Sequence, residues 1–324
     1  MKILITGGAG FIGSNYVNDL VSRESQWSEI LILDSLTYAG NQSNLEFAFT
    51  DKRVKFIKGD IRNTELVHQV MENVHTVINF AAESHVDRSI INPNEFVSTN
   101  VLGTATLLEH ALRNGVEKFL HVSTDEVYGS IESGSWNEIS PVAPNSPYSA
   151  SKAGSDMLVL SYYKTFGLPI FISRCSNNFG PFQFPEKFIP LAITNLLDGL
   201  PIPVYGSGLN SRDWLHVTDH CRALNLILEK GTVGEIYNIG GGTEMTNIEL
   251  AKLLSQVLNK SSEFIEFVED RKGHDFRYSV DYEKISSECG YFPTKNFSES
   301  IKETLVWYQK NETWWRRLKN INIK

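Results

Sequence analysis

A glycine-rich turn near the start of the chain most constrains its fold. Gly7, Gly10 and Gly13 follow the apolar run 3–5 directly and open a helical pattern. Glycines in such a turn let backbone N–H groups approach a pyrophosphate at the positive end of a helix. Asp34 ends the next apolar run, where its carboxylate can accept hydrogen bonds from both ribose hydroxyls. The order of strand, glycines, helix and acid predicts a dinucleotide-binding unit.

The first half of the chain alternates short apolar runs with helical stretches. Buried strands are predicted at 3–5, 30–33, 54–57, 77–80, 119–122 and 169–173, and long helices at 95–114 and 148–166. This alternation predicts right-handed crossovers and a parallel sheet covered on both faces. We therefore predict an α/β protein with a Rossmann-type doubly wound parallel sheet. The sheet and the catalytic residues would occupy 1–176, and a smaller mixed α/β lobe over 177–324 would mainly bind substrate, with some segments returning to the first domain.

Composition argues against several other classes of protein. The net charge of −8 disfavours a broad basic surface for nucleic acid. No apolar run approaches the roughly 20 residues that a membrane helix needs. The opening residues read as a strand and a turn, so we expect no signal peptide, no membrane partner and a cytoplasmic location. Cys175, Cys221 and Cys289 are far apart, and no paired ligand spacing indicates a metal site.

The residues around 124 and 148 carry the predicted chemistry. Lys152 follows Tyr148 by one helical turn, and its charge would lower the tyrosine pKa from its usual value of about 10. Thr124, Asp125 and Glu126 follow a predicted strand that must end near 123, because strand alternation would otherwise turn Asp125 away from its neighbours. An acid and a base beside the Tyr–Lys pair indicate an enzyme that oxidises an alcohol and also eliminates water.

Longer motifs show which family the chain resembles. The glycine pattern with Tyr-x-x-x-Lys is similar to the extended short-chain dehydrogenase/reductases, and 123–129 resembles the signature of their nucleotide-sugar 4,6-dehydratases. The branch acting on dTDP-glucose is similar over 33–41, 81–89, 174–181, 185–187, 210–214 and 270–275. Two departures are the variant sequence 182–184 and a short segment at 129–147; the short segment would alter the rim of the expected site but not the acid/base residues.

The resemblance implies an NAD-dependent lyase that converts dTDP-glucose to dTDP-4-keto-6-deoxyglucose and water. Tyr148 would take the proton at C4, with Thr124 beside it. Glu126 would be the base at C5, and Asp125 the acid that protonates the C6 oxygen. No arginine or lysine directly follows Asp34 to receive a 2′-phosphate, which favours NAD over NADP.

Binding residues follow from the same resemblance. The expected cofactor contacts are Gly7, Gly10, Phe11, Ile12, Gly13, Asp34, Ser35, Leu36, Thr37, Asp60, Ile61, Phe80, Ala81, Ala82, Ser84, Thr99, Tyr148, Lys152 and Asn178, with Asn100 in support. The expected substrate contacts are Ser84, Thr124, Asn177, Glu186, Lys187, Pro203, Tyr205, Arg212, Asn247, Arg271 and His274.

The resemblance also implies a homodimer through a four-helix interface, built from the helices at 95–114 and 148–166 of each copy. The residues expected to supply both the core and the interface patch are Met157, Leu158, Leu160, Tyr162, Leu107, Leu108 and Leu112.

Three other functions compete with this reading. A UDP-glucose 4,6-dehydratase would use the same residues, because the physics of the chain does not separate thymine from uracil. A nucleotide-sugar 4-epimerase would share Tyr148 and Lys152 but would not need Asp125 and Glu126. A catalytically silent NAD-sensing regulator would need none of these four side chains.

Overall fold

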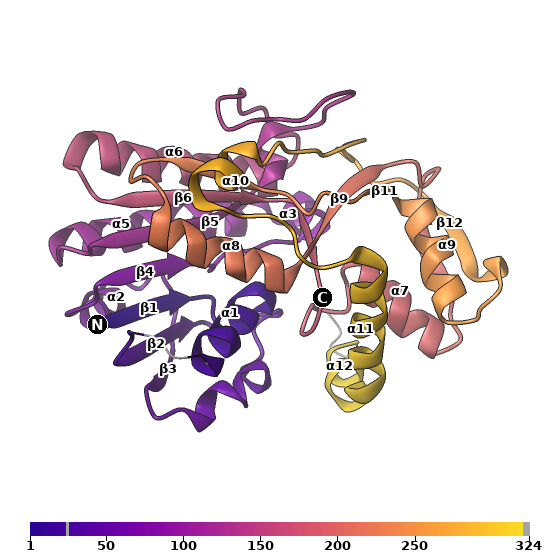
Figure 1. The fold of residues 1–324 in the computed structure, drawn as a ribbon, viewed down its shortest axis with the longest axis horizontal. Coiled ribbons are helices and arrows are strands. Elements are labelled where there is room, and N and C mark those ends of the chain that lie inside the picture. Colours follow the sequence, from indigo (N-terminus) through magenta and orange to yellow (C-terminus); the bar gives the residue numbers. More distant parts are fainter. Residues whose placement is uncertain (24–25, 320–324) are drawn as a thin grey trace.

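One parallel sheet of seven strands organises the larger lobe, and Figure 1 shows the smaller lobe at its side. The computed structural model describes residues 1–23 and 26–319. The sheet order is β10-β6-β5-β4-β1-β2-β3, and every neighbouring pair is parallel. Its strands are β1 (Lys2–Thr6), β2 (Glu29–Asp34), β3 (Val54–Lys58), β4 (Thr76–Asn79), β5 (Lys118–Thr124), β6 (Ile170–Cys175) and β10 (Ile236–Ile239). The strand order reverses between β1 and β4, and ligands of such sheets bind at this switch point.

Both faces of the sheet are covered by helices, which confirms the predicted doubly wound class. Ile3 and Ile5 of β1 enter one apolar layer and Leu4 enters the other. The first layer includes α1 (Phe11–Ser22), α8 (Val217–Lys230) and α10 (Glu283–Cys289). The second includes α2 (Thr64–Val70), α5 (Thr104–Arg113) and α6 (Pro147–Phe166). Burial on both faces explains why these strands read as continuous apolar runs.

The smaller lobe has an apolar core of its own. Its strands form the sheet β11-β9-β7 and the pair β12-β8. They are β7 (Asn177–Phe179), β8 (Ile202–Tyr205), β9 (Ser211–His216), β11 (Glu244–Thr246) and β12 (Ile265–Val268). The helices that pack with them are α7 (Phe188–Leu197), α9 (Asn247–Val257), α11 (Phe297–Lys310) and α12 (Glu312–Lys319). Residues 320–324 of the predicted second lobe lie outside the described residues.

Three elements that follow residue 176 lie with the larger lobe. They are β10, which extends the main sheet beside β6, and the helices α8 and α10. Short 3₁₀ turns complete the chain at η1 (Gln42–Leu45), η2 (Ala48–Thr50), η4 (Asp125–Tyr128) and η5 (Ser262–Phe264). Among the helices that the structure describes, none is long and apolar enough to cross a membrane.

The helix predicted at 95–114 is interrupted. After α3 (Val86–Ile91), the short α4 (Pro93–Phe96) leads into a π-helical turn, η3 (Val97–Gly103), and then into α5. The π turn carries Asn100, whose side-chain amide donates to the Glu83 carbonyl at 3.0 Å and to the Ser151 hydroxyl at 2.8 Å. Asn100 also accepts from the Glu83 N–H at 2.8 Å. Through Asn100, the π turn therefore links the loop after β4 to helix α6. Such π turns are frequent at functional sites.

Candidate active site

One cavity at the carboxyl ends of the sheet strands gathers most of the predicted site residues. Every predicted catalytic residue lines it, and so does every predicted cofactor residue except Leu36. Of the predicted substrate residues, the cavity is lined by Ser84, Thr124, Asn177, Glu186 and Lys187. Leu36 does not line the cavity, because the chain turns there with φ of 53° and its side chain packs against the apolar core.

The glycine turn leaves room for a ligand at the start of α1. A Cβ atom on Gly7 would lie 2.6 Å from the Ala81 nitrogen, and one on Gly13 would lie 2.3 Å from the Gly7 carbonyl oxygen. Helix α1 begins after Gly10 without a side-chain cap and without an acidic residue in its first turn. Its first N–H groups and its positive end are therefore open to an anion, which fits a pyrophosphate.

Asp34 is held rigidly at the other end of this dinucleotide cradle. One carboxylate oxygen accepts from the Ala9 N–H at 2.9 Å, and the other accepts from the Leu36 N–H at 2.8 Å. Burial raises the pKa of Asp34 although these two hydrogen bonds lower it. Arg62 also lines the cavity, but its guanidinium pairs with Asp60 at 2.7 Å and with Glu95 at 2.8 Å. The fixed carboxylate suits a ribose with free hydroxyls.

The catalytic segment turns directly after β5, as the alternation of side chains along a strand required. Strand β5 runs one residue further than expected, through Thr124, and η4 then begins at Asp125. The Thr124 hydroxyl accepts from the Glu126 N–H at 3.3 Å and donates to the Asp125 carboxylate at 3.3 Å. This cap folds the three side chains into one cavity with Tyr148. Sequence adjacency alone did not determine this arrangement.

The two carboxyl groups of the segment differ in their electrostatic surroundings. Burial raises the pKa of Asp125 well above its usual range, and the charge of Glu126 raises it further. Burial also raises the pKa of Glu126, but the cations Arg271, Lys187 and Arg212 oppose that rise. Asp125 is therefore the better proton donor and Glu126 the better proton acceptor.

The expected lowering of the Tyr148 pKa is not what the structure shows. Burial raises that pKa well above 10, and the neighbouring charges of Glu126 and Cys175 raise it further. Lys152 is itself fully enclosed, and its ammonium donates to the Val122 carbonyl at 2.7 Å. Burial lowers the pKa of Lys152 to about 8. Desolvation and nearby acidic groups thus outweigh the effect of a single lysine one turn away.

Six predicted substrate residues lie in the smaller lobe and do not line this cavity. They are Pro203 and Tyr205 on β8, Arg212 on β9, Asn247 at the start of α9, and Arg271 and His274 after β12. The Tyr205 and His274 rings meet edge to face at 6.0 Å. The charges of Arg271 and Arg212 nevertheless act on Glu126, so these two cations lie near the catalytic segment.

Several residues of the cavity were not predicted. Tyr38 and Phe184 line it and contact each other edge to face at 5.6 Å, and the Arg88 guanidinium lies 3.6 Å above the Tyr38 ring. Tyr38 and Arg88 lie within the family-like segments 33–41 and 81–89, which could have indicated them, whereas Phe184 belongs to the variant sequence 182–184. Cys175 also lines the cavity, with its sulfur 3.5 Å from the Ser123 carbonyl. Across 1–23 and 26–319, no cluster of three or more His, Cys, Asp or Glu side chains is placed to hold a metal ion.

Comparisons with known proteins agree with this geometry. A family model described as GDP-mannose 4,6 dehydratase matches residues 4–304. A dTDP-glucose 4,6-dehydratase of Actinoplanes sp. is 54% identical, with 97% of this chain and 100% of the relative covered. The crystal structure of a dTDP-glucose 4,6-dehydratase from Streptomyces venezuelae with NAD and TYD bound is 51% identical, has a TM-score of 0.96, and covers 98% of this chain and 100% of its own. A UDP-glucose 4-epimerase of Thermotoga maritima shares the fold at a TM-score of 0.89 but is only 29% identical, over 96% of this chain and 99% of its own.

Proposed function

Since the chain belongs to the GDP-mannose 4,6-dehydratase family, we propose that it is an NAD-dependent dTDP-glucose 4,6-dehydratase. It converts dTDP-glucose to dTDP-4-keto-6-deoxyglucose and water. The observation that carries the proposal is the meeting of Asp125 and Glu126 with Tyr148 and Lys152 in the cavity that also holds Asp34 and the glycine turn. NAD⁺ held by the glycine turn and Asp34 would supply the hydride acceptor for C4 and, once reduced, the hydride donor for C6, and its oxidised ring would add positive charge to the site.

The residues of the first step are Tyr148, Thr124 and Lys152. Tyr148 must first lose its own proton; as the phenolate it takes the proton of the C4 hydroxyl, and Thr124 donates a hydrogen bond to the same oxygen. The Thr124 hydroxyl also contacts the phenol and lowers its pKa, which partly offsets the rise caused by burial. Lys152 contributes a positive charge inside the closed site, where electrostatic effects are strong.

Elimination of water uses the two acidic residues. A ketone at C4 makes the C5 proton acidic, and Glu126 takes it and gives it back to C5 when hydride is added at C6. Hydroxide is a poor leaving group, so Asp125 gives its proton to the C6 oxygen as water departs. The raised pKa of Asp125 keeps that proton available at neutral pH.

We propose that the two lobes divide this work. The larger lobe, built mainly from 1–176, holds the dinucleotide and the reacting sugar. The smaller lobe holds the nucleoside diphosphate through the basic side chains Lys187, Arg212 and Arg271, because phosphates are recognised by arginine and lysine. The enclosed acid Asp125 and base Glu126 disfavour an epimerase, which would not need them. The presence of Tyr148 and Lys152 beside them disfavours a catalytically silent regulator, which would need none of the four side chains.

Incubation with sugar nucleotides tests the assignment directly. The protein is mixed with dTDP-glucose or with UDP-glucose, and loss of water is followed by mass spectrometry. We expect dehydration of dTDP-glucose at the higher kcat/KM. Faster dehydration of UDP-glucose would assign UDP-glucose as the substrate instead. Conversion to a sugar nucleotide of unchanged mass would favour the epimerase.

Cofactor choice should depend on the charge of Asp34. We expect the wild-type protein to bind NAD at least roughly tenfold more tightly than NADP, because the carboxylate repels a 2′-phosphate. Asp34→Asn should narrow that ratio. Asp51→Asn is the matched control, since Asp51 pairs with Arg53 on the surface and does not line the cavity. Calorimetric titration with each dinucleotide gives the ratio, and equal wild-type affinities would contradict the prediction.

We also propose that the protein is a cytoplasmic homodimer, because its three cysteines are buried free thiols and an apolar patch lies on the expected interface helices. Val97, Leu102 and Met157 are 48%, 60% and 47% exposed on η3 and α6. Of the seven residues expected to form the patch, Leu107 and Leu108 are wholly buried in the core and Met157 is the one that is largely exposed.

Light scattering tests the dimer. At micromolar concentration we expect the mass of two chains for the wild-type protein. Leu102→Glu should shift the mass towards one chain, because it places a charge within the apolar patch. Ile139→Glu is the control, since Ile139 is 93% exposed and lies outside η3, α5 and α6. A wild-type monomer would refute the proposal.

A further inference from the structure

An extended segment over 273–281, which we call the strap, joins the two halves of the site. On one side it bridges β9, where Arg277 pairs with Ser211. On the other side it bridges the loop 129–146, where Val280 pairs with Trp136. Arg271, which the proposed function places at the diphosphate, lies directly before the strap, and His274, an expected substrate contact, lies within it.

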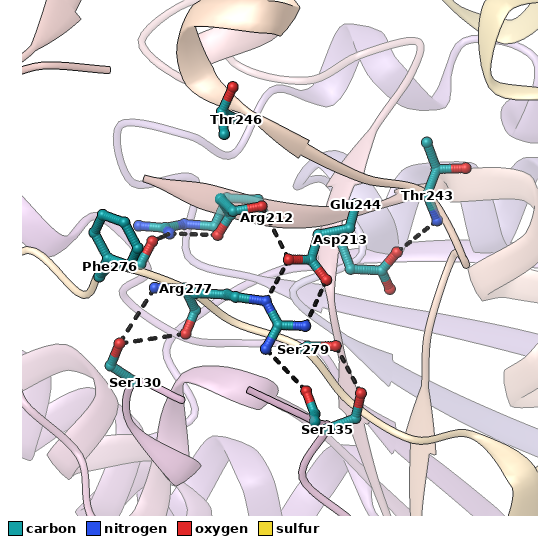
Figure 2. A network of polar contacts seen from close by, with 12 residues as sticks. Ser130, Ser135, Arg212, Asp213, Thr243, Glu244, Thr246, Phe276, Arg277 and Ser279 are labelled. Carbon is teal, nitrogen blue, oxygen red and sulfur yellow. Dashed lines mark hydrogen bonds and ion pairs between the residues drawn. The ribbon is translucent and has the colours of Figure 1, made fainter. Parts of the chain in front are cut away.

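Figure 2 shows how side chains hold the strap to both partners. The Arg277 guanidinium forms an ion pair with the Glu244 carboxylate of β11, and it donates to the Gly134 carbonyl at 2.8 Å. The Ser135 and Ser279 hydroxyls meet at 2.8 Å. These contacts lie far along the loop from its junction with α6, so they fix the position of the strap but do not reach the catalytic helix.

Asp275 makes the contact that does reach it. Its side chain is 5% exposed, and one carboxylate oxygen accepts from the Asn145 side-chain amide at 2.6 Å. The other oxygen accepts from the Tyr278 hydroxyl. The Asp275 carbonyl accepts from Arg212 at 2.8 Å and from Asn210 at 3.2 Å. One buried residue is thus bonded both to a cation of the proposed diphosphate site and to the loop before α6.

Asn145 stands at the entrance to the catalytic helix. The next residue, Ser146, caps α6: its hydroxyl accepts from the Ser149 N–H at 3.1 Å. Tyr148 lies in that same first turn. A shift of Asn145 therefore moves the helix cap and the tyrosine together, because the cap sets where the helix starts.

We propose that Asn145 and Asp275 are positioning residues that couple nucleoside diphosphate binding in the smaller lobe to the placement of Tyr148. The coupling rests on the proposed function, since it needs a nucleotide at Arg212, Arg271 and His274. A nucleotide bound at Arg212 acts on the Asp275 carbonyl that Arg212 contacts, and the Asp275 carboxylate holds Asn145 and the first turn of α6. Remote binding energy is thereby used to align the reacting group.

Hydrogen exchange with dTDP, which lacks the sugar, tests the coupling. In the wild-type protein we expect dTDP to slow exchange of the amides in 146–151 by roughly tenfold. Asn145→Ala should abolish that response while dTDP still binds. With dTDP-glucose, the same variant should lower kcat by roughly 10- to 100-fold with little change in KM, the scale of a slightly misplaced group. Ser135→Ala is the matched control, because it removes another bond between loop and strap and should preserve both responses.

A charge exchange separates coupling from mere stability. Asn145→Asp places two carboxylates together, so dTDP should no longer slow amide exchange in 146–151. Adding Asp275→Asn should restore that effect of dTDP, because the amide at 275 can then donate to the carboxylate at 145. Exchange is the decisive readout for this pair, since Asp275 also raises the pKa of Glu126 and its removal affects turnover directly. The proposal is overturned if dTDP still slows amide exchange in 146–151 of Asn145→Ala. It is also overturned if Asn145→Ala speeds that exchange equally with and without dTDP.

Calorimetry of dTDP with the wild-type protein comes first: absence of binding refutes the proposed function, whereas binding without protection of 146–151 refutes only the coupling.

Discussion

Tyr148→Phe is expected to slow reduction of bound NAD⁺ by dTDP-glucose by roughly 10²–10⁴-fold, the usual scale for a positioned acid/base group. The substitution removes one hydroxyl from an enclosed ring, so affinity for NAD and for the sugar nucleotide should be retained. The dependence should be strong because the Thr124 hydroxyl contacts the Tyr148 phenol and both side chains line the cavity together with Lys152. Single-turnover absorbance of the reduced dinucleotide measures the rate.

A tyrosine on the same helix provides the control. Tyr163→Phe removes a hydroxyl from α6 at a position that is 37% exposed and outside the cavity, so the wild-type rate is expected. If Tyr148→Phe reduces the dinucleotide as fast as this control, another group takes the C4 proton and the mechanism must be redrawn.

Glu126→Gln should separate oxidation from elimination. The amide cannot take the C5 proton, yet Tyr148 and Lys152 are unchanged, so oxidation at C4 remains possible. Reduced dinucleotide should therefore accumulate when dTDP-glucose is added, while dehydrated product falls by roughly 10²–10⁴-fold. Absorbance and mass spectrometry of the same samples report the two quantities.

Glu132→Gln is the matched control for this change, because Glu132 is exposed on the loop 129–146 and does not line the cavity. It should dehydrate the substrate normally. Near-normal product formation by Glu126→Gln would show that Glu126 is not the C5 base. Loss of both signals would place Glu126 in binding or oxidation instead.

The features that the sequence predicted well depend on short-range geometry. Gly7 and Gly13 must lack a side chain because the backbone passes within van der Waals contact of them, and Asp34 must end its strand to face the same cavity. The runs of apolar residues predicted buried parallel strands because both faces of the sheet are covered. The local pattern was sufficient for these features.

Other features were only partly visible. The turn after β5 was required by the alternation of side chains, but the strand ends at Thr124, one residue later than expected. The π turn at 97–103 was missed, because it places Asn100 against Glu83 and Ser151, which are distant in sequence. Leu107 and Leu108 were assigned to both core and surface, and packing put them wholly in the core.

The sequence by itself determined the fold class, the dinucleotide turn and the chemical identity of the acid, the base and the Tyr–Lys pair. Only the tertiary structure decided their electrostatics and their coupling. Tyr148 has a raised pKa because it is enclosed with acidic groups from other segments, and Asp125 differs from Glu126 because three cations of the smaller lobe act on Glu126. Desolvation and Coulomb interactions depend on distance in space, and the contact between Asn145 and Asp275 spans 130 residues of chain.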